Sequence, residues 1–179
     1  MDECERELLA EIRPSSGILH WSPDAGWTCA QIVRHLIRTE QTMLIMWAVA
    51  PRLGRWPALL RSMDQLNARL WRAMGMRTIE AGAVGPDTPE AGRFHAPVFL
   101  RPGKGAVHSC ESLIAWRRRV RQRSLRAISR MDESALHGVR WSHPLLGEYT
   151  MLEFARFLGI HERHHLPRLR WLRESHPGA

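Results

Sequence analysis

The chain has 179 residues, 44% hydrophobic and 25% charged, which fits one compact domain with its own core. Its three cysteines form no CxxC pair and indicate neither a disulfide framework nor a thiolate zinc site. The net charge is +8, and nearly all of the positive side chains are arginines. The absence of an aromatic series or recognition motif argues against a nucleic-acid partner. No apolar run approaches the roughly 18 residues of a membrane span, and the acidic first residues lack a signal pattern, so we expect a cytoplasmic protein.

Two amphipathic helices are expected in the first third of the chain. The first runs from about Cys4 to Ile12 and stops before Pro14, because proline disfavours helical geometry in the residue that precedes it. A loop follows. Thr28 and Gln31 then form a capping box, in which each side chain binds a backbone amide of a new helix. That helix carries an apolar stripe and reaches at least residue 50.

The middle of the chain has a weaker pattern. Residues 52–76 keep a helical period, which indicates an additional helix whose apolar stripe could cover its own bundle or support a homodimer. Residues 81–107 are dense in glycine and proline without a sustained period. They predict a long connection over the surface, which would allow neighbouring helices to run parallel.

Two further helices are expected in the second half. One runs from about Ser109 to Met131 and carries the densest arginine run, most of which we expect to be a solvated face. A loop without a convincing strand follows, and a capping box of Thr150 and Glu153 opens the last helix. The four helices predict an all-α four-helix bundle with long crossover connections, in which ligand sites lie between facing helices.

Three histidines form a candidate metal site. His161 and His165 are four residues apart, and their helical phase places both within the apolar arc of the last helix. His35 lies at the border of the apolar stripe of the second helix. Three neutral nitrogen donors leave coordination positions open, as in catalytic zinc sites. The alternative is that these are ordinary histidines with local hydrogen bonds.

Three stretches resemble a known family: WSPDAGWTCAQIVRHLIRTE, ESLIAWRRRVRQRSL and HPLLGEYTMLEFARFLGIHERHHLPRL. They are similar to the second, third and fourth helices of the DinB/YfiT-like superfamily, which consists of metal-binding four-helix bundles. Carried over position by position, the resemblance implies that His35, His161 and His165 are the metal ligands and that His164 is not. It covers most of the chain and implies one DinB-like domain over residues 1–179.

Two further residues are candidates for a catalytic role. The family commonly has glutamine where this chain has Arg168, which follows Pro167 inside the last helix. Arg168 could contact an anionic substrate group, or could be a solvent-exposed arginine at the end of the bundle. Glu40 lies on the apolar stripe of the second helix, where a carboxylate needs a partner. It could orient a ligand histidine or take a proton, although a structural salt bridge is the favoured interpretation.

The resemblance implies two kinds of activity, hydrolysis and transfer or isomerisation with a low-molecular-weight thiol. Our first hypothesis is a thiol S-transferase or hydrolase that acts on a small molecule and uses a divalent transition metal, with zinc, nickel and iron all compatible with imidazole. A second is a non-catalytic metal-binding stress-response or ligand-binding protein. A third is iron-dependent oxygen chemistry. Substrate turnover separates the first from the second, and oxygen uptake identifies the third.

Overall fold

The computed structural model describes residues 2–12, 16–24, 26–53, 65–66, 69, 100, 109–143 and 147–177. The chain forms two compact units, unit 1 with residues 1–42, 98–123 and 157–179, and unit 2 with residues 43–97 and 124–156. Most of the predicted helix over 52–76 and of the predicted connection over 81–107 lies outside the described residues. That the whole chain forms a single domain stays a prediction.

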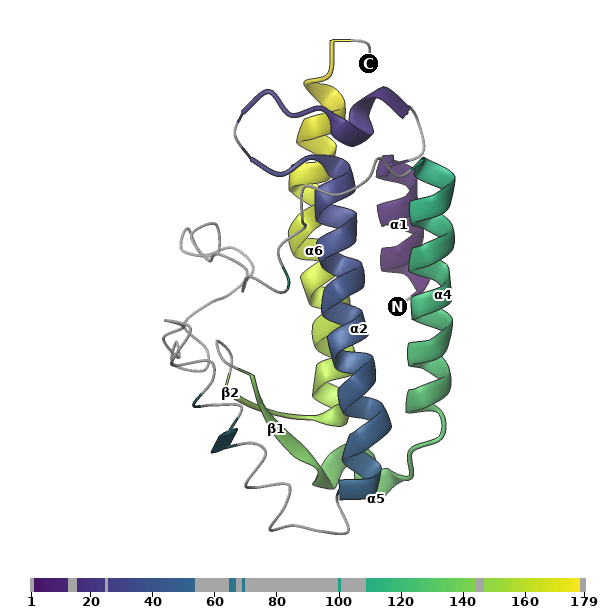
Figure 1. Cartoon of the computed structure of the whole chain (residues 1–179), viewed down its shortest axis with the longest axis vertical. Coiled ribbons are helices and arrows are strands. Elements are labelled where there is room, and N and C mark those ends of the chain that lie inside the picture. The colour runs from purple at the N-terminus through teal and green to yellow at the C-terminus, as the bar shows by residue number, and fades with distance from the viewer. Residues whose placement is uncertain are drawn as a thin grey trace. The chain divides into compact units, whose positions relative to one another are not determined.

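Helices dominate the described residues, so the predicted all-α class is confirmed (Figure 1). The elements are α1 (Asp2–Ile12), the 3-10 helix η1 (Ser16–His20), α2 (Cys29–Leu53), α4 (Cys110–Ile128), α5 (Glu133–Gly138), β1 (Arg140–His143), β2 (Gly147–Thr150) and α6 (Met151–Glu174). None of the described helices has the length and hydrophobicity that a membrane span requires.

Both predicted capping boxes are present. The Thr28 amide donates to Gln31 Oε1 at 2.9 Å, and the Gln31 amide donates to Thr28 Oγ1 at 3.3 Å. At the start of α6, the Thr150 amide donates to Glu153 Oε2 at 2.7 Å and the Glu153 amide to Thr150 Oγ1 at 3.2 Å. These reciprocal bonds fix where α2 and α6 begin. They therefore also fix which residues of each helix share a face.

In unit 1, the described parts of α1, α2, α4 and α6 pack around a shared apolar core. Leu8 of α1, Val33 of α2, Leu113 of α4 and Leu169 of α6 are all fully buried and belong to the same cluster. The segment that precedes α2 was predicted to be a loop, yet it contains η1, whose Ile18 and Leu19 join the core. Packing of an apolar stripe from each helix against the others holds this bundle together.

Unit 2 contains a short β-hairpin that the sequence did not predict. Strands β1 and β2 pair antiparallel, with Trp141 opposite Tyr149 and His143 opposite Gly147. The prediction of a loop without strands is therefore wrong over these residues. Each strand has only four residues, too few for an alternating pattern to stand out, and strand pairing depends on neighbours across the hairpin.

Candidate metal centre

The three predicted histidines converge within unit 1. His35 comes from α2, whereas His161 and His165 come from successive turns of α6. The Nε2 atom of His161 lies 3.2 Å from Nε2 of His35 and 3.2 Å from Nε2 of His165. One nitrogen from each ring lies within 4.8 Å of the other two. The convergence expected from helical phase is thus confirmed.

The spacing of these nitrogens suits a single metal ion. Imidazole nitrogens that bind the same zinc ion at about 2.0–2.1 Å lie roughly 3 Å apart. The 3.2 Å separations are close to that value. Zinc, nickel and iron all accept imidazole nitrogen. The group of His35, His161 and His165 could therefore hold a divalent transition-metal ion.

A backbone carbonyl orients the ring of His35. The Nδ1 atom of His35 lies 3.1 Å from the carbonyl oxygen of Leu100. Because a carbonyl oxygen only accepts hydrogen bonds, Nδ1 carries the proton and the lone pair is on Nε2, which faces His161. Ligand histidines in metal sites are commonly oriented in this way. Leu100 lies in the region predicted as a connection, and no sequence pattern marked it.

Aromatic rings flank two of the histidines. The ring of Trp27 lies 5.0 Å from that of His35, centroid to centroid. Phe157, one helical turn before His161, stacks on the His161 ring at 5.4 Å with an interplanar angle of 10°. Apolar rings at these positions limit the access of water to the imidazoles, which strengthens electrostatic interactions nearby.

The surroundings keep two of the imidazoles neutral. Burial lowers the pKa of His35, an effect that the hydrogen bond to Leu100 partly opposes. Desolvation lowers the pKa of His165 to about 3, and repulsion from His35 and His164 adds to the shift. Although His165 keeps part of its surface exposed, the groups packed around its ring exclude most of the water from it. Neutral rings retain the lone pairs that metal binding requires.

These shifts predict how the stability of the metal-free protein depends on pH. Below about pH 6.5 the unfolded chain protonates its histidines, whereas His35 and His165 in the folded protein do not follow until lower pH. The free energy of unfolding should therefore fall as the pH drops from about 6.5 towards about 3. Urea denaturation at several pH values measures this dependence.

The matched variant His165→Asn isolates the contribution of one ring, because carboxylates also titrate at the acidic end of this range. The variant should lose less stability than the wild type over the same pH interval. Parallel curves for the two proteins would show that His165 titrates equally in the folded and unfolded states.

His164 lies beside the site without joining it. Its ring is 5.4 Å from that of His165, centroid to centroid. Among the described residues, the group of converging nitrogens consists of His35, His161 and His165. That His164 is not a ligand stays a prediction.

Arg168 binds a loop residue. Its Nη1 and Nη2 atoms lie 2.9 and 2.6 Å from the two carboxylate oxygens of Asp24, and Nη2 also donates to Ser22 Oγ at 3.3 Å. The guanidinium lies over the ring of Trp171, 4.3 Å from its centroid. Hydrogen bonds from Arg168 are the main reason that the pKa of Asp24 lies well below its usual range. A contact between Arg168 and an anionic substrate stays a prediction.

The Arg168–Asp24 pair connects α6 to the loop before α2. Gly26 of this loop approaches the guanidinium so closely that a Cβ atom at residue 26 would lie 2.5 Å from Nη2 of Arg168. The next residue is Trp27, whose ring contacts His35. The pair thus fastens the loop that places an aromatic ring beside the histidines.

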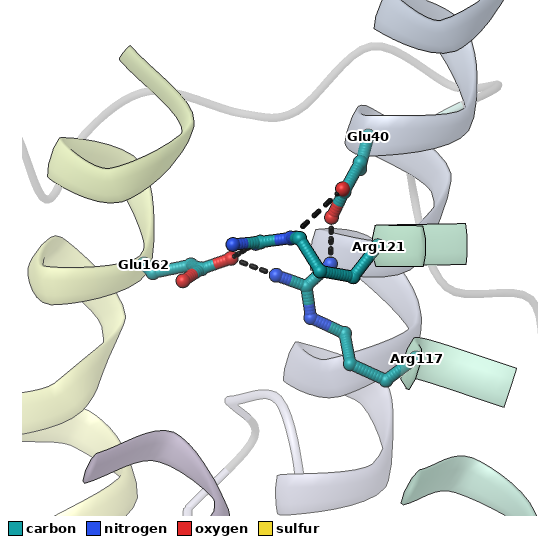
Figure 2. A network of polar contacts seen from close by, with 4 residues as sticks. All are labelled: Glu40, Arg117, Arg121 and Glu162. Carbon is teal, nitrogen blue, oxygen red and sulfur yellow. Dashed lines mark hydrogen bonds and ion pairs between the residues drawn. The ribbon is translucent and has the colours of Figure 1, made fainter. Parts of the chain in front are cut away.

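Glu40 lies in a buried network of two glutamates and two arginines (Figure 2). Its Oε2 binds Nη1 of Arg117, and its Oε1 accepts from Nε of Arg121 at 2.9 Å. Both arginines also bind Oε1 of Glu162. The side chains are at most 3% exposed. This is the structural salt bridge favoured for Glu40, whereas a catalytic role for Glu40 stays a prediction.

The sequence predicted that most of the arginine run of α4 would face solvent, but two of its arginines are buried. Arg118 and Arg119 are exposed as expected, but Arg117 and Arg121 are buried. Their spacing could have indicated this burial, because Arg117 lies one helical turn after the core residue Leu113 and Arg121 lies one turn further. Their carboxylate partners come from two other helices, which no local pattern reveals.

Thr39 gives a prediction about stability. It lies one turn after His35 and is 3% exposed, and its hydroxyl has no hydrogen-bond partner among the described residues. Thr39→Val keeps the shape of the side chain and removes an unsatisfied polar group. It should raise the free energy of unfolding of the metal-free protein by about 1 kcal/mol, measured by urea denaturation.

Thr42→Val is the control for Thr39, because the Thr42 hydroxyl donates to the Arg38 carbonyl at 3.0 Å. This variant loses a hydrogen bond and should be no more stable than the wild type. If Thr39→Val were instead the more destabilised of the two, its hydroxyl would have a partner in solution.

Comparison with protein families agrees with this geometry. The family model of the DinB superfamily matches residues 2–167 of the 179, a range that contains all three histidines. No curated protein and no solved structure matches the chain. The match covers most of the sequence, including α2, α4 and the part of α6 that carries His161 and His165. The chain therefore belongs to the DinB superfamily.

Proposed function

We propose that this protein is a metal-dependent enzyme, a thiol S-transferase or hydrolase that acts on a small molecule. His35, His161 and His165 hold one divalent transition-metal ion through Nε2. The observation that carries the proposal is the convergence of these nitrogens within 4.8 Å of one another. Membership of the DinB superfamily supports it. A cytoplasmic location and a homodimer stay predictions from the sequence.

The chemistry follows from the donor set. Three neutral imidazoles leave the charge of a divalent ion uncompensated, so a water or thiol bound to that ion has its pKa lowered towards neutrality. The protein keeps His35 and His165 unprotonated through the shifts in their pKa. The Leu100 carbonyl holds the ring of His35 in the tautomer that presents Nε2.

The aromatic neighbours give the site a further property. Trp27 and Phe157 lie against the rings of His35 and His161 and reduce their contact with water. Apolar rings beside a few polar groups suit a small organic substrate. The proposed co-substrate of the transferase is a low-molecular-weight thiol, and that of the hydrolase is water.

The test is metal loading followed by activity screening. Purified protein is loaded separately with zinc, nickel and ferrous iron, analysed for bound metal, and assayed with several thiols plus electrophilic acceptors and with simple esters and amides. We expect turnover that requires bound metal, proceeds with zinc in the absence of oxygen, and is lost in His161→Ala. Stoichiometric metal without turnover of any substrate would favour the non-catalytic alternative. Oxygen uptake restricted to the iron form would indicate oxygen chemistry.

A further inference from the structure

Two arginines of α4 join the same two helices that carry the histidines. Arg117 and Arg121 are four residues apart and lie between Glu40 of α2 and Glu162 of α6 (Figure 2). Each arginine binds both carboxylates, and the Arg121 Nε to Glu40 Oε1 distance is 2.9 Å. Helix α4 therefore connects α2 to α6 twice over.

Stability alone is a poor explanation for this network. Removing four charged groups from water is costly, and apolar residues of similar size often replace buried ion pairs with no loss of stability. The four described side chains carry two positive and two negative charges, which balance one another. The best-attested use of such buried polar groups is to fix one arrangement of helices among several.

The network lies close to the histidines along both helices. Glu40 follows His35 by five residues, about 8 Å along the axis of α2. Glu162 directly follows His161 and precedes His165 by three residues. Helix α4 contributes none of the converging nitrogens. Its two arginines thus act on the helix segments that bear the ligands, without belonging to the ligand set.

The guanidinium groups make this arrangement specific. A guanidinium is a planar fork with fixed donor directions, so one group can bind two carboxylates only in a narrow geometry. Sliding α2 by one residue would turn Glu40 by about 100° around the helix and break both of its contacts. The same slide would move His35 away from His161, and metal–nitrogen bonds tolerate changes of only about 0.2 Å.

We propose that Arg117 and Arg121 are positioning residues for the metal centre. By binding Glu40 and Glu162 together, they set the register and spacing of α2 and α6 at which Nε2 of His35 meets the two Nε2 atoms of α6. This inference rests on the proposed metal-binding function. It adds that the two arginines hold the histidines in place before the metal binds.

The test is the affinity for zinc of Arg117→Lys/Arg121→Lys. This double variant keeps the charge of the network but replaces both forks with single ammonium groups. We expect zinc affinity, measured by competition with a chromophoric chelator, to fall about tenfold or more, as it does when outer-shell partners of metal ligands are lost. The absorption spectrum of the cobalt-loaded variant should also differ from that of the wild type, because the ligand geometry has changed.

A control and a second variant separate positioning from general stability. Arg170→Lys weakens the 2.9 Å pair between Arg170 of α6 and Glu11 of α1, which does not involve α2, and should leave zinc affinity within about twofold. The apolar replacement E40L/R117M/R121M/E162L removes both carboxylates and both guanidinium groups together and should match the wild type in thermal stability without metal. We expect it nonetheless to bind zinc about tenfold more weakly.

The outcomes distinguish this inference from the proposed function. Wild-type zinc affinity in the lysine double variant or in the apolar variant would overturn the positioning role and leave the metal centre intact. Failure of the wild-type protein itself to bind zinc or cobalt would overturn the proposed function and the positioning role together.

Discussion

His161→Ala and His165→Ala should each remove stoichiometric metal from the protein, whereas His164→Ala should keep it. Each of the first two variants deletes one of the converging nitrogens. Loss of an outer-shell partner already costs about 10–100-fold in metal affinity, so loss of a direct ligand should cost about 100-fold or more. Elemental analysis after gel filtration, together with chelator competition, measures the effect.

The comparison with His164→Ala controls for a general effect of removing a histidine from this part of α6. His164 adjoins His165 in the sequence, and its ring lies 5.4 Å from the ring of His165. Equal metal content in the three variants would show that the ligand assignment is wrong. Far-ultraviolet circular dichroism confirms that each variant is folded before its metal is counted.

Glu40→Ala should destabilise the protein by about 3–5 kcal/mol, because it removes one of the two carboxylates that balance the charge of two buried arginines. Both carboxylate oxygens of Glu40 bind arginines, and the side chain is 1% exposed. Both arginines would keep their contacts with Glu162. Urea denaturation of the metal-free protein measures the loss, as a shift in midpoint at unchanged slope.

The double variant Glu40→Ala/Arg117→Ala tests the electrostatic origin of this loss. It restores neutrality, so it should be less destabilised than the sum of the two single variants, with a coupling of about 1–3 kcal/mol. Glu3→Ala is the surface control, since Glu3 and Arg163 are exposed and 4.0 Å apart. A loss for Glu40→Ala no larger than that for Glu3→Ala would contradict the description of the network as buried and coupled.

The parts of the fold that depend on local sequence could be predicted. The starts of α2 and α6 follow from reciprocal bonds between residues three apart, Thr28 with Gln31 and Thr150 with Glu153. The inward orientation of His161 and His165 follows from their phase relative to the apolar residues of the same helix. Both kinds of information are present within a few helical turns, so reasoning from a single sequence reaches them.

The parts that depend on contacts between distant segments could not be predicted. The bond from His35 to the Leu100 carbonyl joins residues 65 positions apart, and the chain shows no pattern that pairs them. The burial of Arg117 and Arg121 requires carboxylates from α2 and α6 to neutralise them. Burial of a guanidinium is favourable only when it is paired, and the sequence alone does not show these partners. The arginine run was therefore expected to be mainly exposed.

X-ray absorption spectroscopy of the zinc-loaded protein identifies the atoms that bind the metal. We expect a zinc ion bound by three imidazole nitrogens at about 2.0–2.1 Å, with oxygen as a further ligand, or sulfur when a thiol is added. A spectrum with fewer than three imidazoles, or with sulfur at about 2.3 Å in the absence of added thiol, would contradict it.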